Sequence, residues 1–369
     1  MSPEAVIPPL SSALDLAREA RQAATSFDAK RLIDEKVQEI EAALILAAGV
    51  TIDGLSETET LIPGESVNVA VRVYDPEISS VEVSDIQLRA PAGWTTNALP
   101  EAQLQNEQNF RRREMASAEF GFTVQVPDDA RPTQPYWLER SREGFNYDWS
   151  EAGEAQGEPF GEPLLTAVVS LTVRDTAITV EREVEFRERD RVRGELRRRL
   201  DVVPAISVEP ATASVIVPAA SAKRSHDVRL TVRNNAAAPT SGTASIDAPD
   251  GWILEPASAD FSLAASPATT TLSFTATMPG EIDAGNYQLD GVANVDGNAY
   301  RQNMRVIAYP HIRTHRVYEP ATTTFGVIDV EVAPVRVGYV MGSGDRVPEG
   351  LRRLGVEVEI MDDAMLTTG

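Results

Sequence analysis

Two histidines near the C-terminal end are spaced as zinc ligands often are. His311 and His315 lie four residues apart, which on a helix would place two imidazoles on one face. Pro310 and the apolar residues Ile312 and Val317 instead favour an extended connector, and no third ligand is fixed nearby. We therefore predict surface or interface histidines and no metal site here.

A glycine-rich turn forms the second candidate site. Gly342-Ser343-Gly344-Asp345 follows an apolar run and precedes a short helix, the position of a phosphate-binding loop. Val347 occupies the place of the third glycine of the G-x-G-x-x-G pattern, which favours a structural turn. Gly342, Gly344 and Asp345 are the candidate residues, with Asp345 either capping the helix or acting at the strand's carboxyl end.

An aromatic group provides the most distinctive candidate binding site. Its members are Tyr136, Trp137, Phe145, Tyr147, Trp149 and Phe160, in and just before an acidic, glycine-rich stretch over residues 139–163. Flat aromatic rings beside acids suit stacking on sugars, so the first five are candidate carbohydrate contacts. Packing against a helical segment or a neighbouring domain is the competing and preferred interpretation.

Composition excludes several chemistries. The chain has 369 residues, no cysteine and a formal net charge of −22. Disulfides, thiolate nucleophiles and Cys-ligated zinc are therefore excluded, and nucleic acid and anionic lipid are disfavoured as partners. No catalytic set is recognisable, and we expect no cofactor within this chain. Residues 1–10 have no basic n-region, so we predict no signal peptide, and no apolar run is long enough to span a membrane.

The first 49 residues predict a helical segment. Apolar residues recur at three- and four-residue steps, interrupted around Thr25 and Ser26, and Gly49 stands in the usual C-cap position. This pattern indicates a helical hairpin or one kinked helix. Since two helices cannot form a core alone, their apolar stripe must dock on the first β domain or on a domain outside this chain.

A repeated sequence predicts two β domains of one type. A-P-A-G-W ending at Trp94 corresponds to A-P-D-G-W ending at Trp252, each between runs of alternating apolar residues. We assign residues 50–203 to a first sandwich that contains the aromatic insertion 139–163, and 204–310 to a second. Residues 181–200 interleave eight arginines with six acids, which indicates a salt-bridged, solvated strand pair or linker.

Residues 311–369 predict a connector and the start of an α/β domain. An apolar strand ending near Val340, a helix from Pro348 and a second strand from Val356 form a β-α-β pattern, expected to be buried on both faces. We interpret it as truncated at Gly369. The predicted fold class is mainly β: a helical hairpin, two tandem Ig-like antiparallel β-sandwiches and a truncated C-terminal β-α-β unit.

Several motifs, in this order, resemble the region after the catalytic domain of long bacterial PIG-L (LmbE-like) family deacetylases. They are A-A-L-I-L-A-A-G-V (42–50), P-G-E (63–65), Q-P-Y-W-L (134–138), R-D-R-V-R-G-E (189–195), V-V-P-A-I-S-V (202–208), Y-P-H-I (309–312) and V-G-Y-V-M-G-S-G-D-R-V-P-E-G-L (337–351). The last piece is similar to the start of a class I glutamine amidotransferase-like domain.

The resemblance implies zinc-dependent removal of N-acetyl groups from amino sugars, by a His-Pro-Asp-Asp motif that this chain lacks. Zinc would then be held by a missing N-terminal deacetylase domain, and no catalytic residue can be assigned here. We predict a non-catalytic scaffold that positions that domain and the remainder of the α/β domain, within an exported parent protein. The alternative is a carbohydrate-binding sandwich tandem that uses the aromatic insertion.

Overall fold

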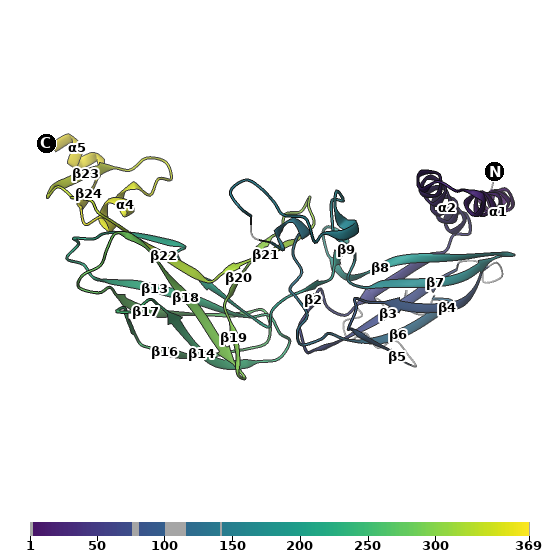
Figure 1. The fold of residues 1–369 in the computed structure, drawn as a ribbon, viewed down its shortest axis with the longest axis horizontal. Helices are drawn as coiled ribbons and strands as arrows, with labels where there is room; N and C mark the ends of the chain where they lie inside the picture. The colour runs from purple at the N-terminus through teal and green to yellow at the C-terminus, as the bar shows by residue number, and fades with distance from the viewer. Residues whose placement is uncertain (1–2, 76–80, 100–115, 141, 369) are drawn as a thin grey trace. The chain divides into compact units, whose positions relative to one another are not determined.

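The structure is a computed structural model that describes residues 3–75, 81–99, 116–140 and 142–368 (Figure 1). It is mainly β, with a helical hairpin at the N-terminal end. The described chain forms two compact units, 1–203 with 308–314, and 204–307 with 315–369. The division after Val203 agrees with the boundary predicted from the sequence.

The helical hairpin consists of a short 3-10 turn η1 (Pro3–Val6), α1 (Ile7–Ala23) and α2 (Phe27–Ala47). Ser26 caps α2, because its hydroxyl accepts a hydrogen bond from the Ala29 amide at 3.2 Å. Gly49 ends α2 with φ +71°, a conformation that a residue without Cβ adopts easily. The structure confirms a hairpin, the first of the two predicted alternatives, and the glycine predicted at the end of its second helix.

The hairpin docks on the first sandwich. Of the two partners predicted for its apolar stripe, the first β domain or a domain outside this chain, the structure shows the first. Ile7, Leu14 and Leu44 are at most 2% exposed and belong to the same buried cluster as the sandwich core. The Arg18 guanidinium also donates to the Ala177 carbonyl at 3.0 Å. The helices and the first sandwich therefore share one core, although residues 1–49 were predicted as a separate segment.

The described residues of the first unit form ten strands. They are β1 (Thr51–Ser56), β2 (Thr60–Leu61), β3 (Ser66–Tyr74), β4 (Val81–Arg89), β5 (Thr95–Leu99), β6 (Ala118–Gln125), β7 (Thr166–Val173), β8 (Thr176–Asp190), β9 (Gly194–Arg199) and β10 (Asp201–Val202). The main sheet has the order β4-β7-β8-β1-β3-β6-β5, with β9 on β8. Its core is built by alternation, since Val67, Val69, Val71 and Val73 of β3 are all at most 3% exposed.

Strand β8 takes part in two sets of pairings. Its first half pairs antiparallel with β7, whereas its second half runs parallel to β1 and antiparallel to β9. Gly54 of β1 lies so close to β8 that a Cβ there would come within 3.2 Å of the Val184 side chain. The charge-dense stretch 181–200 is thus the salt-bridged strand pair predicted from its composition.

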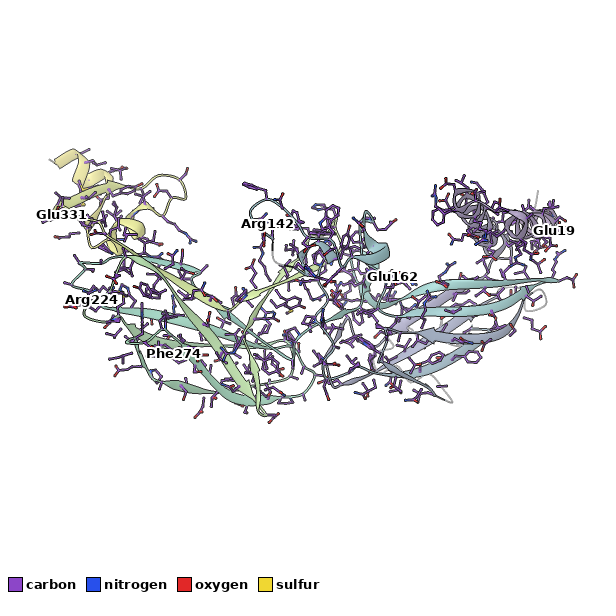
Figure 2. The ribbon with its side chains drawn as sticks, in the orientation of Figure 1. Glu19, Arg142, Glu162, Arg224, Phe274 and Glu331 are labelled. Atoms are coloured by element: carbon purple, nitrogen blue, oxygen red, sulfur yellow. The ribbon has the colours of Figure 1, made fainter. Side chains whose placement is uncertain are left out.

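Among its described residues, the second unit contains a sandwich of two sheets, a separate two-stranded sheet and a small C-terminal part. Its sandwich strands are β11 (Ile206–Pro210), β12 (Ser214–Pro218), β13 (Ser225–Asn234), β14 (Thr240–Asp247), β15 (Ile253–Glu255), β16 (Ser258–Leu263), β17 (Ala268–Thr277), β18 (Gly285–Val295), β19 (Asn298–Tyr300) and β22 (Thr322–Ile328). Strands β20 (Gln302–Ile307) and β21 (His315–Pro320) pair with each other in the separate sheet. The sheets have the orders β11-β13-β17-β15 and β12-β22-β18-β14-β16. Phe274, labelled in Figure 2, and Phe325 are at most 1% exposed in their common core.

The structure extends the second sandwich beyond residue 310, where the sequence placed its end. Strand β22 pairs antiparallel with β18 and parallel with β12, so residues 322–328 are part of the sandwich. The pairing is also not purely antiparallel, since β1 with β8, β2 with β10, and β12 with β22 are parallel. Each parallel pair joins segments far apart in sequence, which periodicity within one strand cannot reveal.

The repeated A-P-x-G-W segment forms the same turn in both sandwiches. The Trp94 amide donates to the Pro91 carbonyl at 3.2 Å, and the Trp252 amide donates to that of Pro249 at 3.3 Å. Gly93 and Gly251 have φ of +87° and +84°. Both indoles are partly buried against the core of their own unit. The repeated segment therefore forms an equivalent turn in the two units.

The C-terminal part is the predicted β-α-β unit: β23 (Arg336–Val340), α4 (Val347–Arg353) and β24 (Glu357–Met361), followed by α5 (Asp363–Thr368). Strands β23 and β24 are parallel. The expectation that both faces would be buried is wrong for this chain, because Val340 is 55% and Ile360 39% exposed. The apolar pattern reflects a parallel strand, but no layer of described residues covers these side chains.

Candidate functional site

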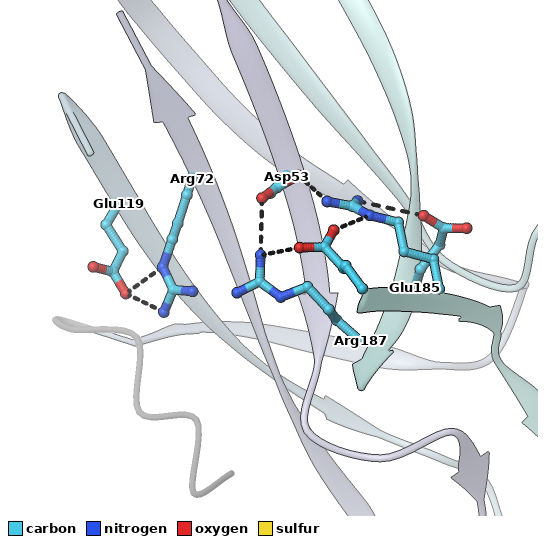
Figure 3. A network of polar contacts seen from close by, with 7 residues as sticks. Asp53, Arg72, Glu119, Glu185 and Arg187 are labelled. Carbon is cyan, nitrogen blue, oxygen red and sulfur yellow. Dashed lines mark hydrogen bonds and ion pairs between the residues drawn. The ribbon is translucent and has the colours of Figure 1, made fainter. Parts of the chain in front are cut away.

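A row of alternating charges crosses one face of the first sandwich (Figure 3). Asp53 of β1 stands directly opposite Arg72 of β3, which in turn stands opposite Glu119 of β6. Asp53 is only 2% exposed and Arg72 only 1%. The sequence did not predict this row of buried charges.

Two arginines from the β8–β9 pair converge on Asp53. Arg197 donates to Asp53 Oδ1 at 2.7 Å and Arg187 to Oδ2 at 3.2 Å, while Arg72 donates to Glu119 Oε1 at 2.9 Å. Burial alone would lower the pKa of Arg197, but hydrogen bonds and charges of Asp53 and Glu195 outweigh it and raise the pKa above the usual value. Each carboxylate and guanidinium named here has an ion-pair partner among the described residues, as buried charges require.

The aromatic candidates divide into a packed set and an exposed set. The Tyr136 ring contacts Trp137 at a centroid distance of 5.0 Å and Trp149 at 6.3 Å, both edge to face. Phe145 is 95% exposed, Tyr147 44% and Trp149 42%. Tyr136 and Trp137 therefore support the loop from within, whereas the other three rings remain available at its surface. Phe160 is partly buried.

An open groove adjoins the end of the aromatic insertion. It has a volume of about 800 Å³ and is lined by Arg89, Ala90, Pro91, Glu162, Pro163, Leu164, Thr166, Glu181 and Glu183. Arg89 and Glu181 form a two-fold ion pair at 2.8 and 2.5 Å, which lowers the pKa of Glu181. The hydrogen bond to Glu181 raises the pKa of Arg89, with a smaller contribution from the charge of Glu162, labelled in Figure 2.

The glycine turn of the C-terminal part is explained by local structure. The Asp345 carboxylate accepts hydrogen bonds from the Tyr339 hydroxyl at 3.0 Å and the Gly342 amide at 3.3 Å. A Cβ at Gly342 would approach Asp345 Oδ2 to 2.7 Å, and Gly344 has φ +79°, so both glycines are needed for the turn itself. Helix α4 has only seven residues and Asp345 does not cap it.

The two histidines of the C-terminal connector are not on a helix. His315 begins strand β21, and His311 precedes it in the 308–314 segment, where its ring lies 6.0 Å from that of Tyr309. Across the described ranges, no group of three or more His, Asp or Glu side chains is placed to hold a metal ion. Among the helices that the structure describes, none is both long and apolar enough to cross a membrane.

One end of the second sandwich holds a half-buried histidine. His226 of β13 packs edge to face on Phe325 at 5.6 Å, and Trp252 packs on the same ring at 5.0 Å. Burial, with a smaller contribution from the charge of Lys223, lowers the pKa of His226 from 6.5. His226 is therefore more readily protonated in the unfolded chain than in the folded one.

This shift predicts a pH-dependent stability of the second unit. The His226 contribution is fully present above about pH 6.5 and is lost as the pH falls through the lower, folded-state pKa. We expect the urea midpoint of this unit to drop between pH 7.5 and 5.5, and to drop less in His226→Phe, which keeps an aromatic ring against Phe325. Equal drops in both proteins would show that His226 does not contribute.

Comparisons with known proteins find no matching family model and no matching curated protein. Among solved structures, native α2-macroglobulin of Escherichia coli is 12% identical with a TM-score of 0.23, over 75% of this chain and 17% of that chain. The Yersinia pseudotuberculosis adhesin InvE is 10% identical with a TM-score of 0.20, over 76% of this chain and 59% of that chain. The Calx CBD1 domain is 10% identical with a TM-score of 0.20, over 34% and 98%. Likenesses this weak carry no argument about function.

Proposed function

We propose that this chain is a non-catalytic scaffold that holds other protein modules at its helical hairpin and at its β-α-β unit. One observation carries the proposal: the hairpin and the β-α-β unit leave large apolar side chains in solvent. The exposed residues are Leu16, Phe27, Leu32 and Leu46 of the hairpin, and Val335, Val340, Met341, Val347, Ile360 and Leu366 of the C-terminal part.

Leaving the apolar side chains of these two surfaces in water is energetically unfavourable. A parallel sheet normally has layers on both faces, and a pair of strands is marginal without them. Leu46 and Phe27 are 81% and 78% exposed on a hairpin whose opposite side already packs on the first sandwich. Contiguous apolar groups left in water commonly mark interaction sites.

The modules that fit best are those implied by the colinear resemblance described above. These are a zinc-dependent N-acetylglucosaminyl deacetylase domain of the PIG-L family on the helical side and the remainder of an α/β domain on the C-terminal side. In this proposal zinc belongs to the deacetylase domain, and the parent protein is exported. The two sandwiches then act as spacers between a hydrolase and an α/β domain.

Acetate release tests the proposal. The complete product of the gene and the chain of residues 1–369 would be incubated with N-acetylglucosamine oligomers and zinc. We expect acetate from the complete product and none above background from the chain alone. Turnover by the chain alone, or a reading frame without a deacetylase motif, would contradict the proposal.

A further inference from the structure

The loop that carries the exposed aromatic rings is held in shape by its own polar contacts. Arg140 donates to Asp148 at 2.9 Å and also pairs with Glu151. The Tyr136 hydroxyl donates to the Glu158 carbonyl at 3.0 Å and accepts from the Gly157 amide at 3.3 Å. A binding surface fixed before the ligand arrives loses little conformational entropy on binding.

Phe145 occupies the tip of this loop. Two hydrogen bonds between the Glu143 and Asn146 backbones, at 3.2 and 3.0 Å, close a tight turn around Gly144 and Phe145. Gly144 has φ +61°, which favours glycine at that position. The turn holds the Phe145 ring out in solvent, where it is 95% exposed and adds nothing to the core.

The rings alternate with polar side chains. Phe145, Tyr147 and Trp149 are separated by Asn146 and Asp148, and the Arg142 guanidinium lies 5.8 Å from the centre of the Tyr147 ring. A flat protein interface would place apolar residues together in a dry centre. Rings that alternate along the chain with hydrogen-bonding groups instead suit a ligand that has apolar faces and polar edges, as pyranose sugars have.

We propose that this loop binds oligosaccharides that are neutral or carry amines, with Phe145, Tyr147 and Trp149 against the sugar rings. Residues 139–163 carry seven carboxylates and two arginines, a net charge of −5. Repulsion within the Debye length, about 8 Å at physiological ionic strength, disfavours glycans built of uronates or sulfated sugars. Glu162, which lines the adjoining groove, is available to a sugar hydroxyl or amine. Binding here is independent of the scaffold role.

Calorimetric titration of the whole chain tests the proposal with three hexasaccharides of different charge. Cellohexaose is neutral, chitosan hexamer is cationic and hexagalacturonate is anionic. We expect at least one of the first two to bind and the third not to bind. Trp149→Ala should weaken that binding at least tenfold, which is about 1.4 kcal/mol, with an unchanged unfolding midpoint.

Phe27→Ala is the matched control, because Phe27 is an exposed aromatic ring, 78% in solvent, outside the loop. It should bind the oligosaccharide as the parent chain does. Failure of all three hexasaccharides to bind would overturn the proposal. So would equal affinity in Trp149→Ala, or preferred binding of hexagalacturonate. If the chain self-associates, binds no glycan and loses the self-association in Phe145→Ala, the loop is a protein interface instead.

Discussion

Replacing Asp53 with alanine is expected to destabilise the first unit by about 3–5 kcal/mol. The wild-type carboxylate is 2% exposed and receives hydrogen bonds from Arg187 and Arg197. The Arg187 side chain is itself only 11% exposed, so the substitution removes the nearer of its two carboxylate partners and leaves only Glu195, at 4.0 Å. The free energy of unfolding, from urea denaturation followed by circular dichroism, measures the loss.

An exposed ion pair of the same unit provides the control. Glu181 pairs with Arg89, but both side chains are more than half exposed, at 54% and 57%. Since solvent screens such pairs, Glu181→Ala should cost about 0–1 kcal/mol. If Asp53→Ala lowered the free energy of unfolding no more than Glu181→Ala does, the buried charge row would contribute no more to stability than an exposed ion pair.

Replacing Phe325 with alanine is expected to destabilise the second unit by about 3–5 kcal/mol. Phe325 is 0% exposed on strand β22 and supports the rings of both His226 and Trp252. Its loss leaves a cavity that neighbouring strands can close only in part. Trp252 is the only tryptophan of the second unit. In a background in which Trp94, Trp137 and Trp149 are replaced, Trp252 fluorescence therefore follows the unfolding of this unit, with and without Phe325→Ala.

Ile253→Ala serves as the control for this core substitution. Ile253 is 58% exposed on strand β15, next to Trp252, so its removal should change stability by no more than about 0.5 kcal/mol. The Phe325 result also tests the extent of the sandwich. A loss below about 1 kcal/mol would contradict the inclusion of residues 322–328 in this core.

Local patterns of the sequence predicted much of the fold. Alternating valines gave strand β3 and its buried face, and the repeated A-P-x-G-W segment gave two equivalent turns. Strand β22 was assigned to a connector, although Thr323, Phe325 and Val327 alternate on its buried face. Its partners β12 and β18 lie elsewhere in the chain. The alternation of apolar residues within one strand does not show which other strands it pairs with.

The candidate sites were less predictable. Asp53, a polar residue within a strand, suggests a solvent-facing position, but arginines more than 130 residues away in sequence bury and pair it. The aromatic insertion was recognisable by composition. Its division into supporting rings, such as Tyr136, and exposed rings, such as Phe145, depends on how the loop closes on itself. Residue type alone could not distinguish these roles.

Hydroxyl-radical footprinting tests the scaffold proposal most directly, because it reports the solvent exposure of individual side chains. Phe27 and Met341, 78% and 50% exposed, would be compared in this chain and in the complete gene product, with Phe145 as the internal reference. We predict that both residues are oxidised in the chain and protected in the complete product, while Phe145 reacts equally in both. Equal oxidation of Phe27 and Met341 in the two proteins would contradict the proposal that these surfaces hold partner modules.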